Sequence, residues 1–156
     1  MTVDEQTGDI FIFTEEGEPP TPISIYRSTD NGKTWVQQET VIAKDSLGHE
    51  LSMHMNEHGI SLRRGPHPGR LLRTARYYAA PARRKRWRQQ YTTAIYSDDH
   101  GKTWQASEPF PARGTGEAGV AELSDGTIYR LDDPVVLTLP AQPPSVAVPV
   151  IEIFLR

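Results

Sequence analysis

The sequence contains no cysteine, and this absence removes several classes of site before any motif is considered. A disulfide scaffold, a thiol nucleophile and a cysteine-ligated metal centre all need residues that the chain lacks. A membrane-spanning helix is not expected either, because the longest weakly charged stretch, residues 134–156, is interrupted by five prolines. The N-terminus has no basic region followed by an apolar run, so we expect no signal peptide within this chain.

Acidic residues are absent from residues 58–97, a stretch that carries ten of the 17 Lys and Arg residues. Its densest part is Arg83-Arg84-Lys85-Arg86-Trp87-Arg88. A basic block with an interleaved aromatic residue is typical of a nucleic-acid patch, but it also fits a solvated loop. We favour the loop, and a nucleic-acid partner is not expected. An Arg every third residue at Arg70, Arg73 and Arg76, inside a strand-like segment, is costly unless each meets a polar cavity or a carboxylate.

Metal and cofactor signals are weak. His49, His54 and His58 lie close together, but the spacing of their neighbouring glutamates is not His-Glu-x-x-His. The sequence also has no glycine-rich phosphate loop and no nucleophile-elbow serine. We therefore expect neither a metal nor a cofactor.

One pattern, Ser-x-Asp-x-Gly-Lys-Thr-Trp, occurs twice, at residues 28–35 and 97–104. Each copy follows a strand-like run and has the chemistry of a tight hairpin: Asp accepts bonds from backbone N–H groups, and Gly supplies a positive φ. The pattern predicts structural roles for Ser28, Asp30, Gly32, Trp35, Ser97, Asp99, Gly101 and Trp104.

A second periodicity accompanies these turns. Gly8, Gly69 and Gly126 each precede a strand-like run, at intervals of roughly 60 residues. No apolar period of 3.6 residues extends beyond about two turns, so helices are not expected. The order of turns and strands predicts an all-β protein built from antiparallel four-stranded units.

The repeated pattern resembles the Asp-box, or bacterial neuraminidase repeat, of the sialidase superfamily. The resemblance implies a six-bladed β-propeller in which the Asp-boxes lie at outer hairpins and are structural. At roughly 60 residues a blade, four blades would need about 240 residues, so the chain holds about two to three. We expect residues 1–129 to form a partial propeller and residues 130–156 to form a divergent proline-rich tail.

The segment from Gly114 to Gly126 resembles the glutamate-containing strand of sialidases. By that resemblance Glu117 is the residue that activates a catalytic tyrosine, and Arg76 and Tyr78 are candidates to line the sugar pocket. The implied partner is a sialylated glycan or a similar acidic sugar. Sialidases use tyrosine because a carboxylate nucleophile would be repelled by the carboxylate of sialic acid. Tyrosine, with a pKa near 10, needs an adjacent base such as a glutamate.

The resemblance is incomplete. Where it implies an arginine that grips the substrate carboxylate, the sequence has Asp133. The other two arginines, the acid/base aspartate and the tyrosine would lie outside these 156 residues, so we expect this chain alone to be inactive. A non-catalytic Asp-box module that binds a ligand or a protein is the alternative. The sequence does not define the cellular compartment, although relatives often act outside the cell or in the periplasm.

Overall fold

The computed structural model describes residues 1–15, 23–52, 58–78, 90–110 and 118–130. Within these ranges the chain is all-β, with no helix and therefore none long and apolar enough to cross a membrane. The strands are β1 (Thr2–Val3), β2 (Ile10–Glu15), β3 (Ile23–Ser28), β4 (Val36–Gln38), β5 (Glu50–Ser52), β6 (Ile60–Ser61), β7 (Leu71–Tyr78), β8 (Gln90–Ser97), β9 (Gln105–Ala106), β10 (Val120–Glu122) and β11 (Ile128–Arg130).

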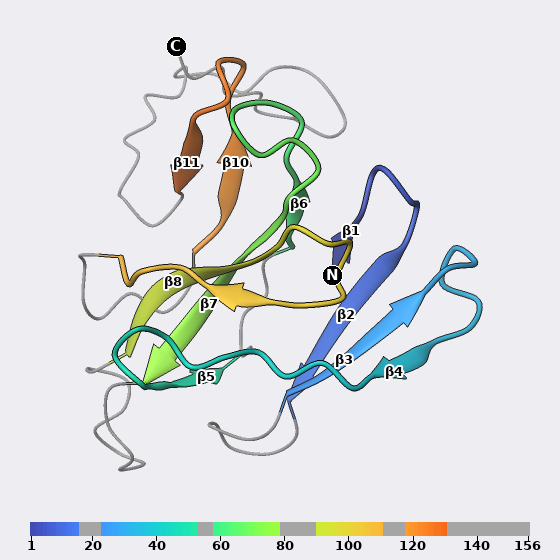
Figure 1. Cartoon of the computed structure of the whole chain (residues 1–156), viewed down its shortest axis with the longest axis horizontal. Coiled ribbons are helices and arrows are strands. Elements are labelled where there is room, and N and C mark those ends of the chain that lie inside the picture. The colour runs from blue at the N-terminus through green and yellow to red at the C-terminus, as the bar shows by residue number, and fades with distance from the viewer. Residues whose placement is uncertain (16–22, 53–57, 79–89, 111–117, 131–156) are drawn as a thin grey trace, which may run out of the picture.

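The strands form three antiparallel sheets that follow one another along the chain (Figure 1). The first sheet has the order β1-β2-β3-β4. The second has the order β5-β7-β8-β9, and β6 also pairs with β7, while the third consists of β10 and β11. Strand β1 contacts β6 and β7, and β10 contacts β7, so each sheet packs beside the next one along the chain, as in propeller blades.

The turn glycines open corresponding strands in the three sheets. Gly8, Gly69 and Gly126 have φ of 80°, 90° and 85°, and β2, β7 and β11 begin two residues after them. A positive φ is costly for residues with a β-carbon, so glycine is suited to these turns. The glycine spacing thus identifies equivalent strands, and the prediction of two to three antiparallel blades is confirmed.

Strand β7 is the centre of the molecule, since all eight of its residues are buried. Side chains alternate across a strand, so β7 feeds two cores. Leu71, Ala75 and Tyr77 pack toward the first sheet, in a core with Phe11, Ile25, Leu51, Tyr91, Ile95 and Trp104. On the other face Leu72 joins Leu62, Ala94 and Val120 toward the third sheet.

The Asp-box tryptophan of the second sheet joins it to the first. Trp104 is 2% exposed and lies edge-on to Phe11 and Phe13 of β2, with ring centroids 5.9 and 5.1 Å apart. Its counterpart Trp35 is 37% exposed and donates from Nε1 to the carbonyl of Gly32. The same motif position therefore contributes to a core in one box and to a local turn in the other.

This contrast yields a stability prediction. Trp104→Ala should lower the free energy of unfolding by about 3–5 kcal/mol, because it empties a buried aromatic site. Trp35→Ala is the matched control and should cost about 1 kcal/mol or less, because its ring is already partly solvated. Urea unfolding of both variants measures the difference. Equal losses would show that Trp104 does not hold the two sheets together.

Candidate functional site

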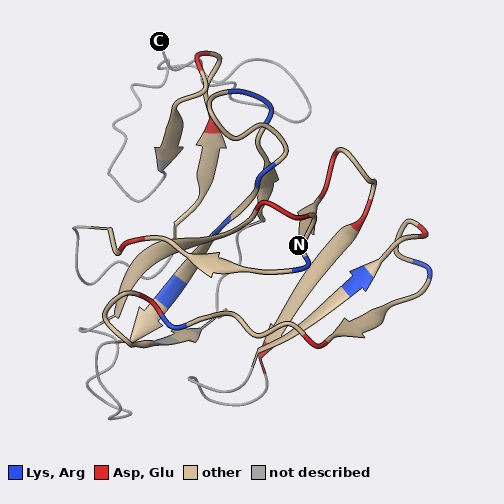
Figure 2. Cartoon of the chain, in the orientation of Figure 1, with Lys and Arg blue, Asp and Glu red and all other residues tan. Residues whose placement is uncertain are grey.

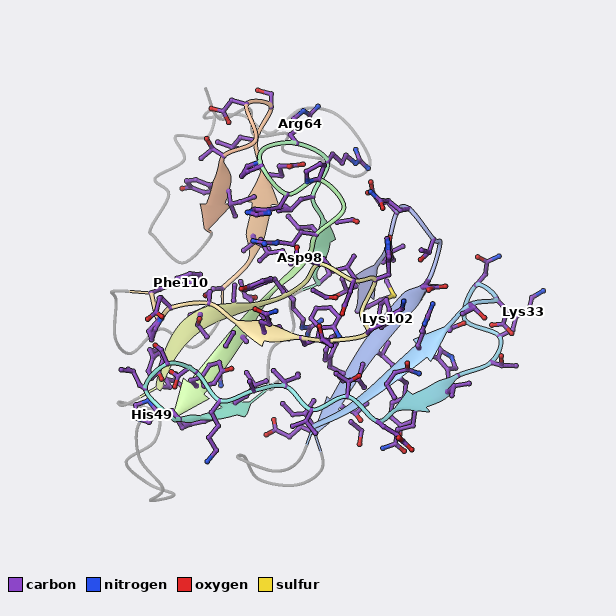
Figure 3. All side chains as sticks on the ribbon, in the orientation of Figure 1. Lys33, His49, Arg64, Asp98, Lys102 and Phe110 are labelled. Carbon is purple, nitrogen blue, oxygen red and sulfur yellow. The ribbon has the colours of Figure 1, made fainter. Side chains whose placement is uncertain are left out.

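The first Asp-box closes its hairpin with side-chain hydrogen bonds. Asp30 accepts from the backbone N–H of Thr34 through Oδ1 at 2.9 Å and from its hydroxyl through Oδ2 at 2.7 Å. Ser28 Oγ donates to Asp30 Oδ1 at 2.8 Å and accepts from the N–H of Gly32 at 2.8 Å. Asn31 and Gly32 both have positive φ, at 60° and 82°. Both carboxylate oxygens thus serve the turn, while Lys33 lies at its tip (Figure 3).

The second Asp-box repeats this geometry. Asp99 accepts from the N–H and the hydroxyl of Thr103 at 2.9 and 2.7 Å, and Ser97 Oγ accepts from the N–H of Gly101 at 2.8 Å. It differs in its surroundings. Gly101 lies so close to the ring of Phe11 that a β-carbon would overlap it. Its turn therefore docks on the first sheet, which needs glycine for both space and backbone angle.

His100 adds a polar contact to this joint. Its Nδ1 lies 2.7 Å from Oδ2 of Asp4, a buried carboxylate in the turn between β1 and β2. Oδ1 of Asp4 accepts from the backbone N–H of Gln6 at 2.9 Å. The second box is therefore tied to the β1–β2 turn by a hydrogen bond as well as by Trp104.

The hydrogen bonds of the first Asp-box predict how the carboxyl group of Asp30 titrates. Those from the Thr34 hydroxyl, the Thr34 N–H and Ser28 lower the pKa of Asp30 to about 2. Such a depressed carboxyl stabilises the fold above its unfolded pKa of about 3.9, and that stability is lost as the pH falls toward 2. Thr34→Val removes one donor and should raise the pKa toward 3.9. NMR titration of the Asp30 carboxyl tests this, and an unchanged pKa would contradict it.

The candidate pocket residues Arg76 and Tyr78 lie on one face of β7, near the end of the strand that is farther from the second Asp-box. Arg76 is opposite Thr92, and Tyr78 is opposite Gln90. Both side chains are buried, at 1% and 7% exposure.

The segment that follows Glu117 reaches this same face. Thr74, on the β7 face that carries Arg76, donates from its hydroxyl to the carbonyl of Ala118. Glu117 itself lies outside the described residues. Its covalent neighbour Ala118 is 2% exposed and packs against the sheet that bears Arg76 and Tyr78.

A buried polar cluster near this end was not predicted from the sequence. Tyr91 donates to the carboxylate of Asp45, and Nδ1 of His49, which Figure 3 labels, lies 2.6 Å from the Tyr91 hydroxyl. The ring of Tyr91 also stacks on Tyr77, with centroids 6.1 Å apart. Tyr91 lies 46 positions from Asp45, so no short-range pattern could reveal the contact.

The surroundings of Tyr91 disfavour its phenolate form. Burial, followed by its hydrogen bond to the Asp45 carboxylate, raises the pKa of Tyr91 above the ordinary value for tyrosine. The hydrogen bond between Tyr91 and Asp45 ties the Asp45–His49 turn to β8.

Several arginines of the basic stretch meet partners inside the molecule. Arg63 makes two hydrogen bonds to Glu5 at 2.6 Å, and Arg70 makes two to Asp98 at 2.7 and 2.8 Å. The Arg73 guanidinium lies 5.1 Å from the centre of the Phe13 ring. In the described part of the chain, Lys and Arg are spread over several strands and turns (Figure 2). The run from Arg83 to Arg88 lies outside it.

The histidines do not form a metal cluster in the part that the structure describes. No group of three or more His, Asp or Glu side chains there could hold a metal ion. His49 contacts Tyr91, as above, and His54 lies outside the described ranges.

Comparison with known proteins defines the class of this fold. Residues 26–37 and 95–106 match the BNR/Asp-box repeat family. A curated sialidase from Micromonospora viridifaciens is 32% identical over 153 residues, covering 81% of this chain and 21% of the relative. With these repeats and this relative, the chain belongs to the sialidase superfamily of Asp-box proteins. It spans about a fifth of the curated relative's length.

Two solved structures share the fold. A Hadza microbial sialidase has a TM-score of 0.56 at 24% identity, covering 81% of this chain and 26% of that one. A protein of unknown function from Dyadobacter fermentans has a TM-score of 0.51 at 19% identity, covering 80% and 40%. The all-β, propeller-type prediction is thus confirmed, while the domain boundary at residue 129 stays a prediction.

Proposed function

We propose that this chain is part of an exo-α-sialidase propeller, whose whole protein removes terminal sialic acids from glycoconjugates. The observation that carries the proposal is the 32% identity to the Micromonospora viridifaciens sialidase over 81% of the chain. The alternation of strands and Asp-boxes in the two larger sheets supports it.

Glu117 is the general base in this proposal. It takes the proton of a tyrosine supplied by another part of the propeller, so that the phenolate attacks the anomeric carbon. The hydrogen bond from Thr74 to Ala118 supports this role, because it holds the residue after Glu117 against the β7 face that carries Arg76.

Arg76 and Tyr78 are the proposed pocket residues. A buried guanidinium suits a carboxylated sugar, because charge-assisted hydrogen bonds are strongest where water is excluded. Both side chains are buried in this chain, so contact with a sugar requires the residues that cover them to be displaced.

The alternative is a non-catalytic Asp-box module that binds a ligand or a protein. One observation favours it: an open cavity among the described residues lies at the box end of β7, and neither Arg76 nor Tyr78 lines it. The isolated chain should in either case fail to hydrolyse a fluorogenic sialoside. Turnover above that of a Glu117→Gln control would contradict this expectation.

A chimaera tests the catalytic role. Residues 1–129 replace the matching region of the Micromonospora viridifaciens sialidase, and activity is measured with a fluorogenic sialoside. Glu117→Gln should lower kcat by about 10²–10⁴-fold, the usual contribution of a general base. Glu39→Gln, at an exposed carboxylate, is the matched control and should leave kcat unchanged. A folded, active chimaera with normal kcat after Glu117→Gln would refute the role of Glu117.

A further inference from the structure

The first Asp-box contains the dipeptide Asn31-Gly32, which occurs once in the printed sequence. Asn-Gly is the pair in which an asparagine side chain loses its amide most readily, because glycine has no side chain to shield its own backbone nitrogen. Asn31 is exposed, and Figure 3 shows the neighbouring Lys33 at the tip of the turn. Water therefore has access to the amide of Asn31.

The conformation of the turn explains why an asparagine stands beside this glycine. Asn31 and Gly32 have φ of 60° and 82°, and His100, the counterpart of Asn31 in the second Asp-box, also has φ of 60°. Asn and His are among the residues that tolerate a positive φ best. Both boxes thus satisfy the same backbone requirement, but the first one does so with a residue that carries a side-chain amide.

Deamidation at this pair begins with the backbone nitrogen of Gly32. The nitrogen loses its proton and attacks Cγ of Asn31, so that an N–C bond forms and the Cγ–Nδ2 bond breaks. Nδ2 takes up a proton in turn and leaves as ammonia. Water then opens the succinimide ring, which yields aspartate or isoaspartate at position 31. The first step needs a Gly32 N–H whose proton solvent base can remove.

In the folded Asp-box this N–H is engaged within the turn. It donates to Oγ of Ser28 at 2.8 Å, and Ser28 is 1% exposed. The adjacent carboxylate of Asp30 already accepts from Ser28 and Thr34 with both of its oxygens. Nε1 of Trp35 donates to the carbonyl of Gly32 at 3.0 Å, which holds the other side of the glycine. Removal of the Gly32 proton therefore requires the turn to open.

We propose that Asn31 is a deamidation site that the folded Asp-box keeps unreactive through the hydrogen bond from Gly32 to Ser28. Local opening of the hairpin between β3 and β4 releases the Gly32 N–H and permits the reaction. An isoaspartate at position 31 adds one carbon to the main chain before Gly32. The bonds that join Gly32 to Ser28 and Trp35 then no longer fit together, so the modification makes opening of the box irreversible.

The shielding is tested on the full chain, incubated at neutral pH either folded in buffer or unfolded in urea. Mass spectrometry of the proteolytic peptide that contains Asn31 follows conversion of the amide to the acid. The folded chain should deamidate at least about tenfold more slowly, because reaction occurs only in the open fraction of molecules. Equal rates in the two conditions overturn the proposal.

A pair of serine variants tests the hydrogen bond. Ser28→Ala should raise the rate at Asn31 in the folded chain about fivefold, the factor that corresponds to one hydrogen bond, and should have no effect in urea. Ser97→Ala removes the equivalent hydroxyl from the second Asp-box and should leave the rate at Asn31 unchanged. Circular dichroism confirms that both variants are folded. An unchanged rate in Ser28→Ala, or equal acceleration in Ser97→Ala, overturns the assignment to this bond.

Hydrogen exchange of the Gly32 amide, measured by NMR, provides a readout that does not depend on the chemistry of Asn31. The amide should be protected in the folded chain, and Ser28→Ala should speed its exchange by about the same factor as deamidation, because both reactions need the same opening. Exchange of Gly32 in the folded chain as fast as in the unfolded chain would contradict the shielding.

Discussion

The packing of Trp104 on Phe11 and Phe13 is the contact on which the arrangement of the sheets depends. A two-stranded or four-stranded sheet cannot bury both faces by itself, so each sheet needs a neighbour. The second Asp-box supplies that neighbour contact, with Gly101 allowing close approach and His100 bonding to Asp4. The Asp-box is thus a turn motif and also an element that joins one sheet to the next.

Burial of β7 on both faces follows from this arrangement. A strand covered on two sides would ordinarily be apolar throughout, yet β7 includes Arg73 and Arg76, at 3% and 1% exposure. Burying a guanidinium costs free energy unless it is compensated. For Arg73 the ring of Phe13 provides one such contact. Arg76 lies on the opposite face of β7, the face from which Thr74 donates to the carbonyl of Ala118.

The turns could be predicted because they depend on local chemistry. The contacts that join distant segments could not, because they depend on long-range packing. The two Asp-boxes and the glycine turns depend on residues within eight positions of one another, so the sequence pattern is sufficient to identify them. The burial of Trp104 but not of Trp35 depends on β2, more than 90 positions away from Trp104. The contact between Asp45 and Tyr91 joins residues 46 positions apart and leaves no trace in the local pattern.

The candidate site likewise combines residues that the repeat pattern identifies with residues that it does not. Asp30 and Asp99 use both carboxylate oxygens within their own turns, so the most repeated acidic residues are the least available for chemistry. Binding of a ligand would then depend on residues outside the Asp-box repeat. Strand β7 carries residues outside the repeat at both ends: Leu72 lines an open cavity near the boxes, and Arg76 is buried near the opposite end.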